Sequence, residues 1–313
     1  MSSTQRLIGF TFLTLVLDTT GIFASNIDSL SQIPCESPSL PAGSFHVVVA
    51  AYEEKHCFKQ YLWKLGLTNA LVIIYRRVEP ERPLGRWHGP CGMVVQEKLL
   101  LPNHGKDLSA FHSYVFEYYD NPPLAVLFLH GHGPHAYHTD CHTIVGRARL
   151  FYRGLVSPYE DGAEFARHMV TLTRFSRQGD PDWMHVFPES PMSRRLQEKS
   201  PEEVEATSSC ANLFSKWSVN ATSAGFWSCC ATFILPWDRI LWYPKGFYRE
   251  ALQHSVEPYD DHWTSRVCWE FVVYAWYQEP AVTPSLKKLY LKASDLALQY
   301  DLRGCTDLEP PTC

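Results

Sequence analysis

Residues 101–140 have the sequence LPNHGKDLSAFHSYVFEYYDNPPLAVLFLHGHGPHAYHTD, which contains the clearest structural signals of the chain. Apolar residues recur at helical spacing after Gly105, so the pattern predicts a helix that ends before Pro122 and Pro123. The next seven residues, 124–130, are apolar except for the last, which is typical of a strand buried on both faces. Polar residues follow immediately. A loop, a helix, a buried strand and a polar cluster past its carboxyl end indicate an open α/β sheet, in which ligands bind beyond the strand ends.

Two further apolar runs extend this sheet on the amino-terminal side. Residues 46–51 and 70–75 are rich in β-branched and apolar residues and predict strands. Between them a helical pattern predicts a helix closed by Gly66, and the basic, proline-rich stretch that runs to residue 92 predicts a loop. Because a strand, a helix and a strand with short connections form parallel strands, we expect an α/β fold with a mostly parallel central sheet and flanking helices, similar to Rossmann-like single domains.

Motifs that identify several common enzyme classes are absent. No Gly-x-Gly-x-x-Gly follows the first strand and no Gly-Lys-Ser/Thr phosphate loop occurs, which disfavours common NAD and ATP sites. Gly-x-Ser-x-Gly and His-Glu-x-x-His are also absent, which disfavours the corresponding serine hydrolases and zinc proteases. The formal net charge is −5 without a basic block, so we expect no nucleic-acid partner.

The amino-terminal segment predicts entry into the secretory pathway. Residues 7–17 form an apolar run that, as a helix, would be about 16 Å long, well short of the roughly 30 Å hydrocarbon core of a bilayer. We therefore expect residues 1–25 to be either a cleaved signal peptide or a retained signal anchor, and only the anchor would place the protein at a membrane. The remainder divides into an extended leader, 26–44, an α/β domain, 45–280, and a C-terminal helix with a disulfide-tied tail, 281–313.

The cysteines indicate the same compartment. Ten cysteines are spread along the chain rather than grouped at metal-ligand spacing, which predicts a disulfide-stabilised fold in an oxidising environment. Adjacent Cys229 and Cys230 are expected to pair with different partners, and Cys305 and Cys313 are expected to tie the tail. Asn220 begins an Asn-Ala-Thr glycosylation sequon, which predicts a glycoprotein. The expected location is the secretory pathway, either the Golgi lumen or the extracellular space.

Several short motifs together resemble a known family. They are Val47 to Glu54 (VVVAAYEE), Asn103-x-Gly105-Lys106-Asp107, Tyr119-Asp120-Asn121, Phe128-Leu129-His130, Cys229-Cys230-Ala231-x-Phe233, Arg239-Ile240, Pro244, Phe247-Tyr248 and Ser265-Arg266-Val267-x-x-Glu270. In this order they resemble the family numbered 3431 among domains of unknown function. That family in turn is similar to glycosyltransferases of the GT-A type. The resemblance implies a secretory-pathway enzyme that transfers a sugar from a nucleotide sugar to a glycan or glycoprotein.

The implied reaction assigns roles to particular residues. Such a site must neutralise a leaving diphosphate, with Mn²⁺ or Mg²⁺ or with a basic side chain, and an inverting reaction needs a base. The candidates for nucleotide binding are Tyr52, Glu53, Asn103 and Lys106. The candidates for metal or diphosphate binding are His130, His138 and Asp140. The candidate catalytic base is Glu270, with Asp260 and Asp261 as substitutes.

The chain departs from the family pattern at two positions that matter for this chemistry. Lys106 stands where the family usually has arginine, and lysine cannot make arginine's planar bidentate contact to a diphosphate. No Asp-x-Asp metal motif follows the strand at 124–130, and His138-Thr139-Asp140 is the nearest substitute. The missing Asp-x-Asp motif favours an alternative hypothesis: a non-catalytic secreted carbohydrate-binding or structural protein on the same scaffold.

Each candidate also has a purely structural interpretation. Glu53 can favour a helix amino terminus, and Asn103 can simply form a turn. The histidines after residue 130 can bind Zn²⁺, as in a hydrolase, or be solvated. Glu270 can pair with Arg266 one helical turn away. Aromatic residues, 14% of the chain, can fill the core or form a carbohydrate-facing platform.

Overall fold

The fold is described from a computed structural model. The described ranges are 34–52, 62–80, 83–101, 105–131, 141–157, 161–172, 232–256, 276–277, 284–300 and 302. The predicted signal segment and the cysteines at 229, 230, 305 and 313 lie outside them, as does the sequon at Asn220. Among the described residues, no helix is both long and apolar enough to cross a bilayer.

The central sheet is built from the apolar runs that the sequence predicts as strands. β1 (Phe45–Ala51), β2 (Leu71–Arg76) and β5 (Ala125–His130) are almost entirely buried, because helices cover both faces. β4 (Val94–Leu99) alternates between buried and partly exposed residues and lies outside β2. These four strands are parallel, in the spatial order β4-β2-β1-β5, which confirms the predicted parallel pairing of the first two apolar runs. Most of the helix predicted between these two runs lies outside the described residues.

The whole sheet, however, is mixed. β3 (Arg86–His88) pairs antiparallel with β4, and β7 (Phe233–Pro236) pairs antiparallel with β5 and with β6 (Val170–Thr171). The described sheet therefore has seven strands in the order β3-β4-β2-β1-β5-β7-β6. The expectation of a mostly parallel sheet is wrong at both edges, and the predicted loop before residue 92 contains β3. These edge strands have two to four residues, too short for a recognisable pattern of alternation.

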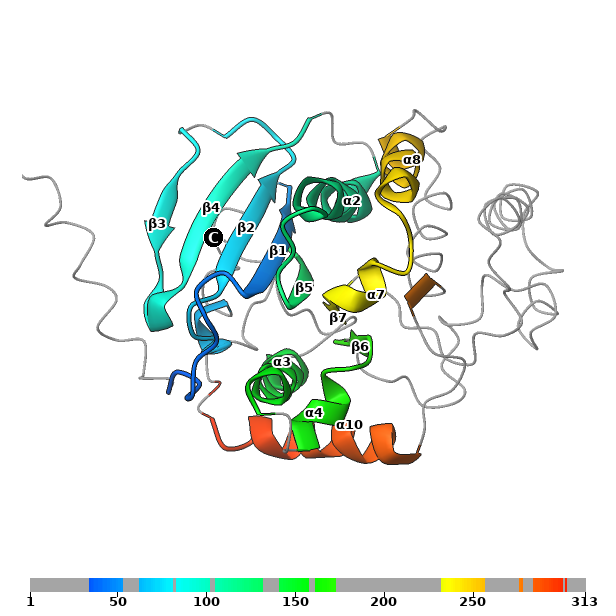
Figure 1. Ribbon diagram of the computed structural model, residues 1–313. Coiled ribbons are helices and arrows are strands. Elements are labelled where there is room, and N and C mark those ends of the chain that lie inside the picture. Colours follow the sequence, from blue (N-terminus) through cyan, green and yellow to red (C-terminus); the bar gives the residue numbers. More distant parts are fainter. Residues whose placement is uncertain are drawn as a thin grey trace, which may run out of the picture. The chain divides into compact units, whose positions relative to one another are not determined.

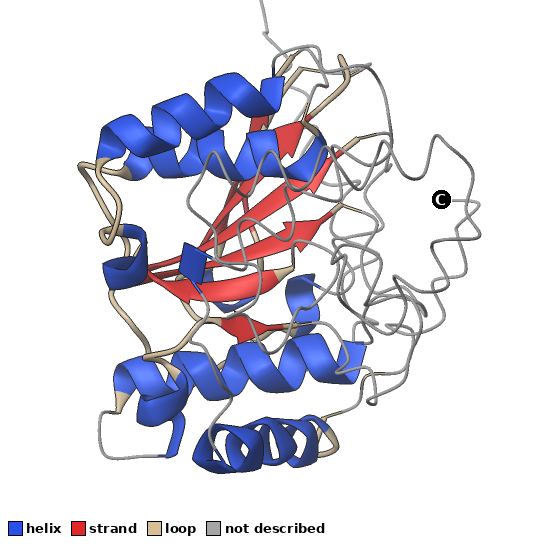
Figure 2. Cartoon of the chain, turned by 90° about the vertical axis from the view of Figure 1, so that its right-hand side faces the viewer, coloured by secondary structure: helices blue, strands red, loops and turns tan. Residues whose placement is uncertain are grey.

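Helices lie in two layers, one on each face of the sheet (Figures 1 and 2). α2 (Lys106–Tyr118) and α8 (Lys245–Val256) pack together on one face. α3 (Cys141–Val156) and α10 (Pro284–Ala297) pack together on the other, where α4 (Asp161–Phe165) joins them. Two short helical turns complete the described elements, η2 (Pro90–Gly92) and α7 (Trp237–Ile240).

The alternation of side chains along the buried strands creates two hydrophobic cores. In β1, Val47 and Val49 face the α3 side, whereas Val48 faces the α2 side. Most aromatic residues in the described ranges lie in or against these cores. Trp276 and Tyr277 are buried against α2 and α8, as the core interpretation predicted. Apolar burial on this scale is the main term that stabilises the domain.

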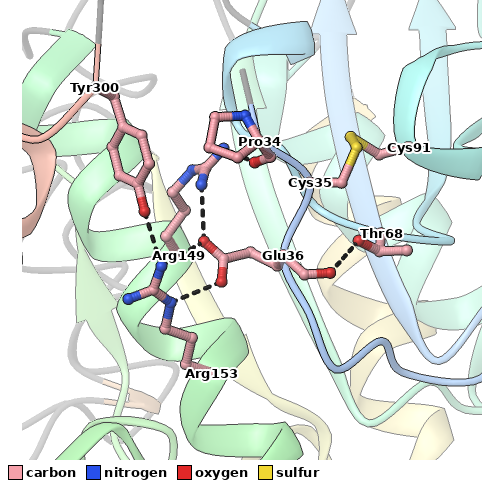
Figure 3. Close-up of polar contacts among 8 residues, drawn as sticks. All are labelled: Pro34, Cys35, Glu36, Thr68, Cys91, Arg149, Arg153 and Tyr300. Carbon is pink, nitrogen blue, oxygen red and sulfur yellow. Dashed lines mark hydrogen bonds and ion pairs between the residues drawn. A yellow bond between two sulfur atoms is a disulfide. The ribbon is translucent and has the colours of Figure 1, made fainter. Parts of the chain in front are cut away.

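Residues 34–44, part of the segment expected to be an extended leader, lie against the domain. A disulfide joins Cys35 to Cys91 in η2, and the side chain of Glu36 is buried against α3 (Figure 3). Cys141, at the start of α3, is disulfide-bonded as well. The prediction of a disulfide-stabilised α/β domain is therefore confirmed.

Candidate functional site at the carboxyl edge of the sheet

The order of the parallel strands defines a topological switch point at their carboxyl ends. From β1 the chain proceeds outward to β2 and β4, and α2 then returns it to β5 on the opposite side of β1. In open α/β sheets, ligands bind at such a switch point, outside the carboxyl ends of the two strands that flank it. Here the two strands are β1 and β5, which end level with each other, because Ala50 pairs with His130.

A carboxylate and an imidazole meet at this point. Asp107 lies in the first turn of α2, and its Oδ2 atom is 2.6 Å from Nδ1 of His130, the last residue of β5. The side chains are 24% and 13% exposed, respectively, so the pair is partly shielded but not sealed. An imidazole held by a carboxylate has a fixed orientation and a defined tautomer, as in metal-binding histidines and in proton-transfer sites.

A buried arginine, Arg77, lies next to the first turn of α2. Arg77 follows β2, its backbone N–H donates to the carbonyl of Ala51, and its Nη1 donates to Oγ of Ser109 at 2.6 Å. Burial lowers the pKa of Arg77 to about 10, while the carboxylate of Asp107 acts in the opposite direction. The guanidinium therefore stays charged at neutral pH and places a positive charge beside the first turn of α2.

Gly105 allows α2 to begin where it does. Its φ is +69°, a left-handed conformation, and a Cβ atom there would lie 2.0 Å from the carbonyl oxygen of Ser255 in α8. Both the turn and the close approach of α8 require glycine. The glycine of the Asn-x-Gly-Lys-Asp motif thus has a packing role in addition to any role in ligand binding.

Three of the predicted site residues lie within the described residues. Tyr52 directly follows β1 at the carboxyl edge and is 44% exposed. Lys106 is the first residue of α2, and His130 is the last residue of β5, so the structure brings all three to one edge of the sheet. The other predicted residues lie outside the described residues: Glu53, Asn103, His138, Asp140, Asp260, Asp261 and Glu270. In the part of the chain that the structure describes, no three histidine, cysteine, aspartate or glutamate side chains are grouped so as to hold a metal ion.

A comparison with protein families identifies the chain. A family model described as "Protein of unknown function (DUF3431)" matches residues 92–291, more than half of the sequence. The chain belongs to this family. The match to DUF3431 includes Asp107 and His130 and excludes Tyr52 and Arg77. No curated protein and no solved structure matches the chain.

Some motif residues that support membership of DUF3431 have structural roles. Arg239 is 3% exposed, and its Nη1 and Nε donate to the carbonyls of Tyr277 and Arg167 at 2.7 and 3.0 Å. The hydroxyl of Tyr248 donates to the carbonyl of Ile240. These contacts fix the connection from β7 through α7 to α8 and place α8 beside α2.

The sequence interpretation missed Asp107 and Arg77 as site residues. Asp107 was part of the quoted motif but received no role, because its partner His130 is 23 positions further along the chain. Arg77 was assigned to a basic loop. The signal that could have identified it is its position directly after a buried strand, where the chain reaches the carboxyl edge of the sheet.

Proposed function

We propose that the protein is a glycosyltransferase-like enzyme of the secretory pathway that transfers a sugar from a nucleotide sugar to a glycan or glycoprotein. The observation that supports this proposal is the Asp107–His130 pair at the switch point between β1 and β5, with Tyr52 and the amino terminus of α2 at the same edge. A nucleotide diphosphate fits the chemistry of this edge, because a helix amino terminus favours anions.

The proposed roles follow from these positions. Tyr52 would contact the nucleotide base or ribose, and Lys106 would contact the diphosphate as a point charge. His130, held through Nδ1 by Asp107, would bind a Mn²⁺ or Mg²⁺ ion together with His138 and Asp140. Glu270, or Asp261 in its place, would accept the proton of the acceptor hydroxyl. The fold of this proposed enzyme is GT-A-like, with added antiparallel edge strands.

The test is the thermal stability of the secreted domain with a panel of nucleoside diphosphates and Mn²⁺. A ligand present at one hundred times its dissociation constant stabilises the folded state by about 2.7 kcal/mol, which is a readily measured rise in melting temperature. We expect one nucleoside diphosphate to raise the melting temperature of the wild type. If none does so at saturating concentration, the protein is not a nucleotide-sugar transferase.

Three variants locate the effect. Lys106→Ala and Asp140→Ala should abolish the nucleotide-dependent rise in melting temperature. Lys288→Ala is the matched control, because Lys288 is an exposed lysine of α10, on the opposite face of the sheet. A rise that persists in Lys106→Ala, or that disappears equally in Lys288→Ala, would place the nucleotide elsewhere.

One observation favours the alternative, a non-catalytic carbohydrate-binding protein. Trp242 is 55% exposed, and the guanidinium of Arg239 lies 4.7 Å from its ring, so the indole is held in place. A fixed, exposed indole can stack on the apolar face of a sugar. Binding to a glycan array without nucleotide, lost in Trp242→Ala but retained in Lys106→Ala, would support this alternative.

A further inference from the structure

The segment that precedes β1 is attached to the domain in an unusual way. Residues 34–39, here called the strap, are mostly exposed, and Glu36 is the one residue of the strap that is buried. The backbone N–H of Glu36 donates to the carbonyl of Gly66 at 2.9 Å. Leu40, directly after the strap, is buried and hydrogen-bonded through its backbone to Tyr152 and Asn69. The strap is therefore attached to the domain through Glu36, through the carbonyl of Pro34 and through the disulfide at Cys35.

The carboxylate of Glu36 is held by two arginines one turn apart on α3 (Figure 3). Arg149 donates from Nη1 to Oε1 at 2.8 Å and from Nη2 to the carbonyl of Pro34, also at 2.8 Å. Arg153 donates from Nε to Oε2 at 2.6 Å and from Nη2 to Oε1 at 3.0 Å and to the hydroxyl of Tyr300 at 2.8 Å. Within the described residues, this cluster contains one carboxylate and two guanidinium groups, so its formal charge is +1.

Such a buried ion pair does not hold the strap firmly by itself. The free energy required to remove the charges from water nearly cancels their mutual attraction, so the net stabilisation is small. Once the strap moves away, water can hydrate the carboxylate and the guanidinium of Arg153, whose side chain is already 36% exposed. The covalent bond at Cys35 must therefore supply most of the restraint on residues 34–39.

That covalent bond has features of a reducible disulfide. Cys35 is exposed and Cys91 is only partly buried, so a thiolate can approach the bond. Cys91 also has a φ of +57°, a left-handed backbone conformation that is unfavourable for a residue other than glycine. Exposed disulfides are generally the labile ones, whereas Cys141 is fully buried and is disulfide-bonded as well.

We propose that the Cys35–Cys91 disulfide is a redox switch that controls whether the strap is docked on α3. A dithiol reductant opens it: one thiolate attacks a sulfur of the disulfide to form a mixed disulfide, and the second thiol displaces the protein sulfur. Two electrons and two protons pass to the protein, which gains two thiols, and the dithiol becomes a cyclic disulfide. The strap then leaves α3 and uncovers Arg149 and Arg153, while Leu40 stays in place as the hinge.

The experiment titrates the folded, oxidised protein with dithiothreitol and follows two signals. Alkylation and mass spectrometry report which cysteines have become thiols, and hydrogen exchange reports the opening of individual amides. We expect Cys35 and Cys91 to be alkylated while Cys141 stays oxidised. We also expect the amide of Glu36 to exchange at least about tenfold faster, because its hydrogen bond to Gly66 is lost. The amide of Gly43, bonded to the carbonyl of Asn69 beyond the hinge, should be unchanged.

Two results would overturn the proposal that this disulfide is a redox switch. The first is a Cys35–Cys91 bond that survives until the whole protein unfolds, which would make it a structural disulfide. The second is reduction of this bond with unchanged exchange at Glu36. The double variant Cys35→Ser/Cys91→Ser should show the fast exchange without reductant, and if it does not fold, the titration of the wild type still decides. None of these outcomes depends on nucleotide binding.

Discussion

The charged cluster under the strap and the charged cluster at the carboxyl edge contain the same kinds of groups but differ in exposure. Glu36 and Arg149 have side chains that are 3% and 1% exposed, and each carboxylate oxygen of Glu36 accepts hydrogen bonds from α3. Asp107 and His130 are several times more exposed and lie where parallel strands end. Because Glu36 and Arg149 are buried, we call their cluster with Arg153 the sealed cluster and infer that it serves the fold. We call the Asp107–His130 pair the open cluster, and it is the better candidate for binding a ligand.

Breaking the sealed cluster should lower the free energy of unfolding more than breaking the open cluster. Glu36→Ala in the oxidised protein leaves the buried guanidinium of Arg149 without its carboxylate, so we expect the free energy of unfolding to fall by about 3 kcal/mol or more. Denaturant unfolding followed by tryptophan fluorescence measures this loss. Arg153→Ala is the matched comparison, and because Arg153 is partly exposed its loss should be smaller. In the Cys35→Ser/Cys91→Ser background the cost of Glu36→Ala should shrink, since the strap is already undocked.

The second-largest loss in the free energy of unfolding is expected at Gly105, in the turn before α2. Gly105→Ala places a methyl group against the carbonyl of Ser255 and forces alanine into a left-handed conformation. We expect a loss of about 2 kcal/mol in the free energy of unfolding, because α8 must shift away from α2. Gly246→Ala is the control. Gly246 lies in α8, the helix that Gly105 packs against, and a Cβ atom at Gly246 meets no atom within 4 Å. Equal losses for the two variants would contradict the packing role of Gly105.

A buried histidine provides a contrast with His130. His46 is 4% exposed and its Nδ1 is 2.7 Å from the hydroxyl of Tyr114; burial lowers its pKa to about 4. The unfolded chain takes up a proton at this histidine below about pH 6.5, whereas the folded protein does not, so stability is retained above that pH and lost as the pH falls towards 4. From pH 7 to pH 5, His46 should account for a loss of about 2 kcal/mol. The measurement is unfolding free energy against pH, and His46→Asn should flatten the profile by that amount.

The open cluster should matter little for stability. Asp107→Asn removes a charge from a partly exposed pair, so we expect the free energy of unfolding to change by less than about 1 kcal/mol. The same variant should abolish the nucleotide-dependent rise in melting temperature, because His130 loses its orienting carboxylate. A loss of stability as large as that of Glu36→Ala would show that Asp107 serves the fold rather than a ligand.

The sequence predicted those parts of the fold that have strong local patterns. β1, β2, β5 and α2 follow from apolar runs and helical spacing, and α10 lies in the segment 281–313, where a C-terminal helix is predicted. The antiparallel edge strands were missed because they are very short and their pairing partners are distant in the chain. Glu36 and Arg149 are separated by 113 positions, so no local pattern connects them.

The sequence predicted His130 as a residue of the candidate site, but not its contact with Asp107 or the buried position of Arg77. The quoted stretch contains both Asp107 and His130, but their contact exists because α2 starts at the edge where β5 ends, which only the assembled sheet determines. His130 was predicted as a metal ligand from the polar cluster after the strand, and the structure adds the carboxylate that orients it. Arg77 was missed because charge alone does not distinguish a buried arginine from a solvated one.

We propose that a nucleotide sugar binds at the carboxyl edge of the sheet, and the sharpest test is hydrogen exchange with and without Mn²⁺ and the nucleoside diphosphate that raises the melting temperature most. With nucleotide bound, we expect slower exchange in the first turn of α2, at residues 107–109, and at the end of β5, at His130 and Gly131. The amides around Trp242 should not change. Protection around Trp242 instead would place the nucleotide elsewhere. Unchanged exchange at the carboxyl edge at a saturating nucleotide concentration would show that no nucleotide binds there.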